Sequence, residues 1–262
     1  MRKGYIDGRY GQIHYYEAGQ GPVLILLHQS PVNGRMYERA MPHLTKAGIR
    51  AIAIDTPGFG NSDAPPAPPT IPDYGDVMHD VLAGFGLEQA HFLGHHTGAG
   101  IAASFAARNP EKVTSLILNG PPLLPPEVLE RFKDVEAGPD PIHADGSHLV
   151  EAWNRRLFYT PGWTDLESMQ RRLVDQFWAG DTAWYGHHAA FSHDFKPDLE
   201  ALAVPTLILT NTGDDIHDMA LESHRLRPDL DFAELEGGTH DIVDEQPENW
   251  SRLVADYVKR RA

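Results

Sequence analysis

The chain has 262 residues, no cysteine and a formal net charge of −15 at pH 7. The lack of cysteine excludes disulfides, thiolate metal sites and a cysteine nucleophile. The acidic balance argues against nucleic acid or an anionic membrane surface as a partner, and it favours a cytoplasmic protein acting on a small molecule. No apolar run approaches ~18 residues and no signal-peptide pattern follows Met1, so no membrane span or secretion signal is expected.

The first part of the chain alternates predicted strands with predicted helices. The run at 23–27 is continuously apolar, which is typical of a strand buried on both faces of a parallel sheet. Further strands are predicted at 11–19, at 49–54, around Phe92 and at 113–119. Helices are predicted at 36–46, at 74–86 and from the turn after Phe92 to about Asn109. These segments predict the first half of an α/β domain.

The composition changes between Pro121 and Pro197, where strand-like apolar runs disappear. Amphipathic stretches at 128–136, 148–158 and 166–179 replace them, and aromatic residues are frequent. We therefore predict a helical cap at 121–197, inserted into a core domain formed by 1–120 and 198–262.

Alternation resumes after the predicted cap. Strands are predicted at 206–210 and 232–235, and helices at 219–226 and 247–260. The whole pattern predicts an α/β fold with a doubly wound, mostly parallel sheet. Sites in such sheets form at the carboxyl ends of the strands. Four polar residues lie at or just beyond predicted strand ends: His28, His96, Asn119 and Asp214.

The stretch Gly94-His95-His96-Thr97-Gly98 has a spacing that carries chemistry. A strand, a Gly-x-Ser-x-Gly turn and a helix form the nucleophile elbow, whose glycines let strand and helix approach closely. The central side chain is held in a strained conformation above the sheet. Here the spacing is kept, but histidine takes the place of serine.

Taken together, the motifs resemble those of the α/β-hydrolase superfamily, in its helical-cap branch. The matching motifs are His28-Gln29, Asp55-Thr56-Pro57-Gly58-Phe59-Gly60-Asn61-Ser62, the elbow, Asp214 and His240. The resemblance implies that His240 is the general base and that Asp214 orients it. It also implies an oxyanion hole from the backbone N–H groups of Gln29 and Thr97, with no cofactor. Asp215 and Asp218 are rival acids, although Asp214 fits the spacing better.

Three roles remain open for His96. It could be a nucleophile that forms an acyl-imidazole, or it could polarise a substrate while His240 activates water. It could also mark a disabled site that only binds a ligand. If His96 and His240 lie close together, both cannot easily be protonated, so one pKa should be depressed.

Other residues are candidates with weaker support. Ser30 is a candidate substrate contact and an outside candidate for a displaced nucleophile, although a turn serine before Pro31 explains it better. Trp153, Phe158 and Trp184 could form an apolar roof or simply the core of the cap. The elbow explains His96, His240 and Asp214 without a metal, so we expect none, although with His28 they could form a zinc or iron site. His28 and His95 are expected to be structural.

These observations favour a hydrolase that acts on a small ester, lactone or related acyl or carbon–carbon bond through His96, Asp214 and His240. Two alternatives remain: a cofactor-free lyase, isomerase or oxygenase-type enzyme that uses the His240 base, and a non-catalytic binding protein. The sequence does not identify the substrate or the oligomeric state, because specificity depends on the cap and the loops.

Overall fold

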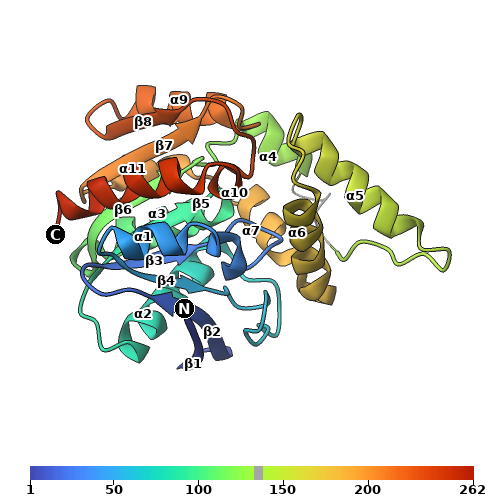
Figure 1. The fold of residues 1–262 in the computed structure, drawn as a ribbon, viewed down its shortest axis with the longest axis horizontal. Helices are drawn as coiled ribbons and strands as arrows, with labels where there is room; N and C mark the ends of the chain where they lie inside the picture. Colours follow the sequence, from blue (N-terminus) through green and yellow to red (C-terminus); the bar gives the residue numbers. More distant parts are fainter. Residues whose placement is uncertain (133–137) are drawn as a thin grey trace.

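The computed structural model describes residues 1–132 and 138–262. Within them one eight-stranded sheet has the order β1-β2-β4-β3-β5-β6-β7-β8 (Figure 1). Only the pairs β1–β2 and β2–β4 are antiparallel among the described strands. The strands are β1 (Arg2–Gly8), β2 (Gly11–Ala18), β3 (Val23–Leu27), β4 (Arg50–Ile54), β5 (Ala90–His95), β6 (Val113–Asn119), β7 (Thr206–Asn211) and β8 (Asp231–Leu235).

Apolar side chains alternate between the two faces of the central strands and build two cores. On β3, Leu24 and Leu26 face the core that contains α1 (Met41–Lys46) and α11 (Pro247–Lys259). Ile25 and Leu27 face the other core, with α2 (Ile71–Gly84), α3 (Thr97–Arg108) and α9 (His217–Leu226). Because a strand covered on both faces has no polar side, its sequence is continuously apolar. The predicted doubly wound α/β fold is confirmed.

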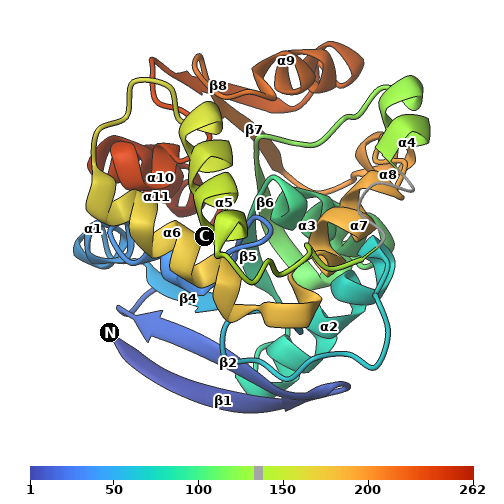
Figure 2. The same ribbon diagram turned by 90° about the vertical axis from the view of Figure 1, so that its right-hand side faces the viewer.

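Between β6 and β7 every regular element in the described part of the chain is helical. These helices are α4 (Pro126–Phe132), α5 (Ser147–Tyr159), α6 (Leu166–Trp178), α7 (Tyr185–Phe191) and α8 (Lys196–Ala201), with a short 3₁₀ turn at Gly180–Thr182. Figure 2 shows α5 and α6 crossing in front of the sheet. We call residues 121–197 the cap segment; its status as a separate unit stays a prediction. The end of the helix predicted at 128–136 lies outside the described residues.

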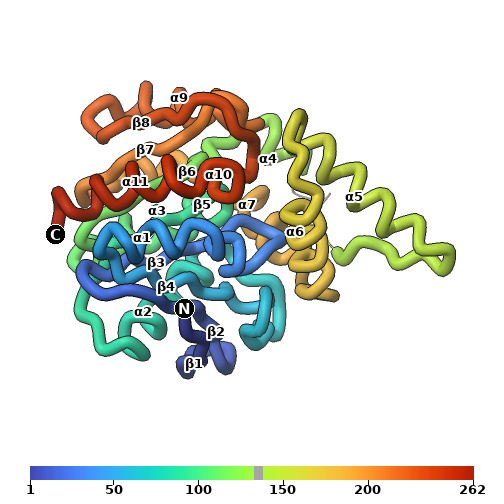
Figure 3. Tube along the Cα trace, in the orientation of Figure 1, coloured from blue at the N-terminus to red at the C-terminus, as the bar shows by residue number. Residues whose placement is uncertain are grey.

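The structure differs from the predicted elements in three places. The helix predicted at 36–46 is split into a 3₁₀ turn, Gly34–Tyr37, and α1, because Pro42 has no backbone N–H and starts a new helix instead. The hairpin strand β1 was not predicted, since its largely exposed residues give no apolar pattern. The short helix α10 (Ile242–Glu245) was also missed. Figure 3 shows β1 and β2 at one edge of the sheet and β8 at the other.

None of the helices in the described ranges combines the length and apolar character needed to cross a membrane.

Helix α11 fixes the end of the central strand β6. Trp250 is fully buried, and its indole N–H donates to Oδ1 of Asn119 at 2.6 Å. The backbone oxygen of Asn119 in turn accepts from the N–H of His96 at 2.9 Å. The last helix therefore holds the strand end beside which the elbow turns.

We expect Trp250→Phe to lower the free energy of unfolding by about 1–3 kcal/mol, because it leaves a buried acceptor of Asn119 without its donor. Urea unfolding followed by circular dichroism measures the change. Trp178→Phe, at a 64% exposed position, is the control and should leave stability unchanged. Equal stability of Trp250→Phe and the parent protein would contradict the role assigned to this bond.

Candidate active site

His96 lies in the sharp turn between β5 and α3. Its φ of 48° is the only positive φ of a non-glycine residue in the described part of the chain. A Cβ at Gly94 would lie 2.0 Å from the backbone oxygen of Gly98, and a Cβ at Gly98 would lie 2.3 Å from that of Leu27. Only glycine fits at these two positions, so the spacing in the sequence forces the turn that presents His96.

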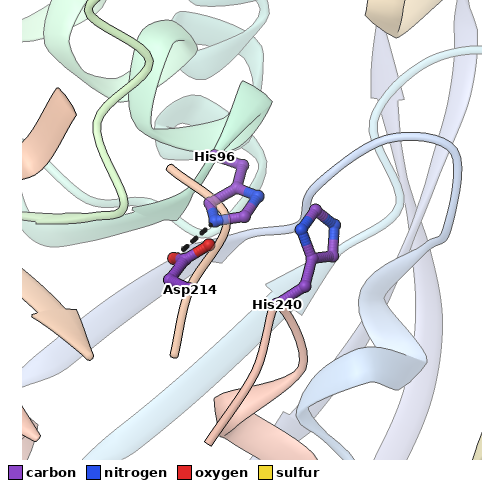
Figure 4. Close-up of side chains that lie close together, drawn as sticks. All are labelled: His96, Asp214 and His240. Carbon is purple, nitrogen blue, oxygen red and sulfur yellow. Dashed lines mark hydrogen bonds and ion pairs between the residues drawn. The ribbon is translucent and has the colours of Figure 1, made fainter. Parts of the chain in front are cut away.

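Two histidine–aspartate pairs lie side by side at this edge of the sheet. Nε2 of His96 is 2.9 Å from Oδ2 of Asp214, and Nδ1 of His240 is 2.7 Å from Oδ1 of Asp215. The two imidazole centroids are 4.4 Å apart, with 74° between the ring planes. Figure 4 shows His96 bonded to Asp214 and His240 beside it.

The expected bond between Asp214 and His240 is therefore wrong. The structure brings His96, Asp214 and His240 together as expected, but Asp214 bonds to His96. An imidazole reaches further from the elbow than a serine hydroxyl, so it extends to the carboxylate of Asp214. The next residue, Asp215, was named as a rival acid and holds His240 instead.

Gly120, which directly follows β6, makes room for the His96 ring. Its φ is +59°, and a Cβ there would lie 2.4 Å from Cδ2 of His96 and 3.0 Å from Oδ2 of Asp214. The absence of a side chain at this position thus leaves the space that the imidazole of His96 occupies. The sequence pattern gave no signal for this role of Gly120.

The two imidazoles differ in protonation. Burial alone would lower the pKa of His96, but the charge and hydrogen bond of Asp214 outweigh it and raise that pKa above its ordinary value of 6.5. Burial first, and then the positive charge of His96, lowers the pKa of His240 to about 4 despite the opposing effect of Asp215. The two pKa values are therefore pushed apart, and a proton is held more readily on His96 than on His240.

The neighbouring histidines are held in the neutral form or in fixed positions. His28 donates from Nδ1 to the backbone oxygen of Gln29 at 2.8 Å and accepts at Nε2 from the N–H of Thr56 at 3.0 Å. His95 packs 4.4 Å from His96 between ring centroids, and burial lowers its pKa well below the ordinary value. These contacts agree with the structural roles expected for both.

The two predicted oxyanion donors follow the ends of neighbouring strands. Gln29 comes after β3, and Thr97 is the first residue of α3, where backbone N–H groups are free of helical partners. The side chain of Gln29 donates from Nε2 to Oδ1 of Asp241 at 3.1 Å. The amide therefore supports the loop after His240, and the oxyanion role of Gln29 and Thr97 stays a prediction.

The predicted substrate contacts have varied surroundings. Ser30 is buried against α7, since a Cβ at Gly186 would lie 1.8 Å from its Oγ. Trp184 is half-buried and packs on Tyr185, with ring centroids 5.0 Å apart. Trp153 is half-buried.

The cap segment nevertheless contributes one ring to the site. Phe158 is 76% exposed, so it is not part of a core of the cap, and its place in an apolar roof stays a prediction. The next residue, Tyr159, contacts His240 instead, with ring centroids 5.9 Å apart. The sequence analysis did not single out Tyr159, because the cap segment is rich in aromatic residues.

The same site offers ligands for a metal ion. One ligand atom each of His96, Asp214 and His240 lie within 4.8 Å of one another, and two imidazoles with a carboxylate suit zinc or iron. His28 is not part of this group, because both of its ring nitrogens face Gln29 and Thr56. The expectation of a metal-free site stays a prediction.

Comparison with known proteins identifies the family. Residues 22–247 match the family model of the alpha/beta hydrolase fold. The chain belongs to this family. It is 26% identical to a non-heme chloroperoxidase of Streptomyces lividans over 257 residues, which are 91% of this chain and 92% of the relative. It is 33% identical to bifunctional epoxide hydrolase 2 of Rattus norvegicus over 129 residues, 47% of this chain but only 23% of that protein.

The fold has close structural neighbours. The enol-lactonase of Burkholderia xenovorans LB400 superposes with a TM-score of 0.82 at 20% identity, covering 98% of this chain and all of the neighbour. An esterase of Exiguobacterium antarcticum gives a TM-score of 0.81 at 19% identity, covering 97% of this chain and 98% of the neighbour. These neighbours share the fold. The family model and the relative named as an epoxide hydrolase support an enzyme of the hydrolase class.

We expect Gly120→Ala to displace His96, because the new Cβ would overlap the ring. The histidine ring signals in NMR spectra report this as a changed titration of His96. Gly86→Ala is the matched control: its φ is +64° but no atom lies within 4 Å of the added Cβ. Both variants should lose about 1–2 kcal/mol of stability to backbone strain. An unchanged His96 signal in Gly120→Ala would contradict the assigned role.

Proposed function

We propose that this α/β-hydrolase-fold enzyme hydrolyses a small carboxylic ester or lactone with a water molecule activated by His240. The observation that carries the proposal is the pair of imidazoles 4.4 Å apart, each bonded to its own carboxylate. One is neutral and can accept a proton, while the other is cationic and can donate. Esters and lactones are also what the esterase and enol-lactonase among the structural neighbours are named for.

Each residue has a defined part in the step. His240 donates Nδ1–H to Asp215, which leaves Nε2 free to take a proton from water. The hydroxide attacks the carbonyl carbon, and the negative charge moves to the carbonyl oxygen. Backbone N–H groups of Gln29 and Thr97, together with Nδ1–H of His96, stabilise that oxyanion. When the intermediate collapses, the carbon–oxygen bond breaks and His240 returns the proton to the leaving alcohol.

The contacts of His96 argue against a nucleophilic role. Its Nε2 is bonded to Asp214, whose charge also raises the pKa of His96 and so favours the form with protons on both ring nitrogens. A protonated imidazole has no lone pair with which to attack a carbonyl. The fixed His240–Asp215 pair, in turn, is what a general base requires and what a site that only binds a ligand does not.

Replacement of either histidine should abolish most of the activity on short aryl esters and lactones. We expect kcat/KM to fall by about 100-fold or more in His240→Ala, which loses the base. We expect kcat/KM of His96→Ala to fall by roughly 100- to 1,000-fold, which is typical of a lost oxyanion donor. Chelators should leave the rate intact. Unchanged turnover in His240→Ala, or an acyl adduct on His96 after rapid quench and mass spectrometry, would overturn the mechanism.

The pH profile of kcat/KM should be bell-shaped. The rate rises with pH through about 4, where His240 becomes neutral. It falls at a pH above 6.5, where His96 loses its proton. Asp214→Asn removes the charge that raises the pKa of His96, so the falling limb should move to lower pH. Asp218→Asn, at an exposed position on α9, is the control and should not move it. A falling limb that stays in place in Asp214→Asn would contradict the assignment.

A further inference from the structure

A cluster of buried charges joins the cap segment to the core directly beside His240. It consists of Arg156 on α5, Arg171 and Arg172 on α6, Asp241 before α10 and Asp244 within it. Arg172 is fully buried and lies 3.1 Å from Oδ2 of Asp244 and 3.6 Å from Oδ1 of Asp241. Arg171 lies 2.6 Å from Asp244, and Arg156 contacts Asp241. We call this group the seam cluster.

The seam cluster has more cationic donors than acceptors. Three guanidinium groups with five N–H bonds each face two carboxylates. In the described part of the chain, the buried atoms Nε of Arg156, Nε of Arg171 and Nη1 of Arg172 have no hydrogen-bond partner, and on the acceptor side Oδ1 of Asp244 has none either. Gln29 adds a further donor to Asp241. Asp175, also on α6, pairs through Oδ1 with Arg35 at 2.9 Å and forms no ion pair with the arginines of the seam cluster in the described part of the chain.

This imbalance affects Arg156 most directly. Burial first, and then the neighbouring Arg172, lowers the pKa of Arg156 to about 9, although Asp244, Asp215 and Glu245 oppose this. Buried ionic groups are stable only when their charges and hydrogen bonds are matched. An anion that accepts from Arg156 would meet this requirement.

Arg156 faces the reaction site. Residues three apart on a helix lie on one face, and Tyr159, three positions after Arg156, contacts the ring of His240. Asp241, which Arg156 contacts, directly follows His240 in the chain. The positive charge of Arg156 also lowers the pKa of both His96 and His240, so the three groups share one electrostatic environment.

We propose that Arg156 binds a carboxylate of the substrate, so that the enzyme acts on anionic esters or lactones that carry a free carboxylate near the scissile bond. This inference rests on the proposed hydrolysis at the same site. A guanidinium matches a carboxylate in two parallel hydrogen bonds, which gives affinity and fixes orientation. Arg172, buried behind it, holds Asp241 and thereby positions Arg156.

The test compares two esters of equal length. Phenyl hydrogen succinate carries a terminal carboxylate where phenyl butyrate carries a methyl group. We expect kcat/KM for the succinate ester to exceed that for the butyrate ester by at least about tenfold, as is typical of a charge-assisted pair. Arg156→Met should remove the preference, mainly by raising KM for the succinate ester, and Arg156→Lys should retain part of it.

Arg171→Met is the matched control, because Arg171 lies in the same cluster but, among the described residues, its side chain bonds to Asp244 and Ser168 rather than to Asp241. Both methionine variants should lower the melting temperature, whereas only Arg156→Met should change the ratio between the two esters. The inference is overturned if the parent enzyme shows no preference, if Arg156→Met slows both esters equally, or if Arg171→Met abolishes the preference as well.

A binding measurement separates this inference from the proposed function. If neither ester is hydrolysed, the choice of ester hydrolysis fails, and free succinate becomes the probe. Displacement of the His240 ring signals by succinate in NMR spectra, lost in Arg156→Met but kept in Arg171→Met, supports a carboxylate site. Absence of succinate binding to the parent protein, or equal binding to Arg156→Met, overturns it.

Discussion

The hydrogen bond of 2.9 Å between His96 and Asp214 determines the arrangement of the site. The two glycines of the elbow force the strained turn that projects His96, and Gly120 leaves the space that the ring fills. With Asp214 engaged by the elbow residue, the base cannot use it. His240 is held instead by Asp215, whose pKa stays below its ordinary range because the hydrogen bond and charge of His240 outweigh burial. One substitution at the elbow is thus matched by a second acid–histidine pair.

Much of the fold could be predicted, because it depends on patterns within single segments. The apolar run of β3, the glycine spacing of the elbow and the amphipathic stretches of α5 and α6 each carry their own signal. The sequence carries no such signal for which histidine of the site pairs with which aspartate. Asp214 and Asp215 are adjacent in the sequence, and which histidine each one meets depends on how far the His96 ring extends. That reach is set by Gly120, which lies on a different strand end.

The cap segment shows the same limit. Composition indicates a helical segment rich in aromatic rings, but Phe158 and Tyr159 are neighbours with opposite surroundings, one exposed and the other against His240. The orientation of α5 determines which of these two side chains contacts His240. The seam cluster was not predicted either, because Arg156 and Asp241 belong to segments far apart in the chain and meet only when α5 covers the end of the sheet. In the proposed function, contacts between cap and core would carry the specificity that sequence patterns do not reveal.

Charge connects the two parts of the site. The site accommodates one cationic imidazole, because a proton on His96 opposes a second proton on His240. Arg156 adds to that opposition and keeps His240 a weak base in the free enzyme. A carboxylate bound at Arg156 would cancel this charge and raise the pKa of His240 from about 4 toward the working pH. Since a general base is most effective when its pKa lies near that pH, an anionic substrate would strengthen the base that activates the attacking water. The guanidinium of Arg156 would then bind the substrate and also determine the pKa of His240.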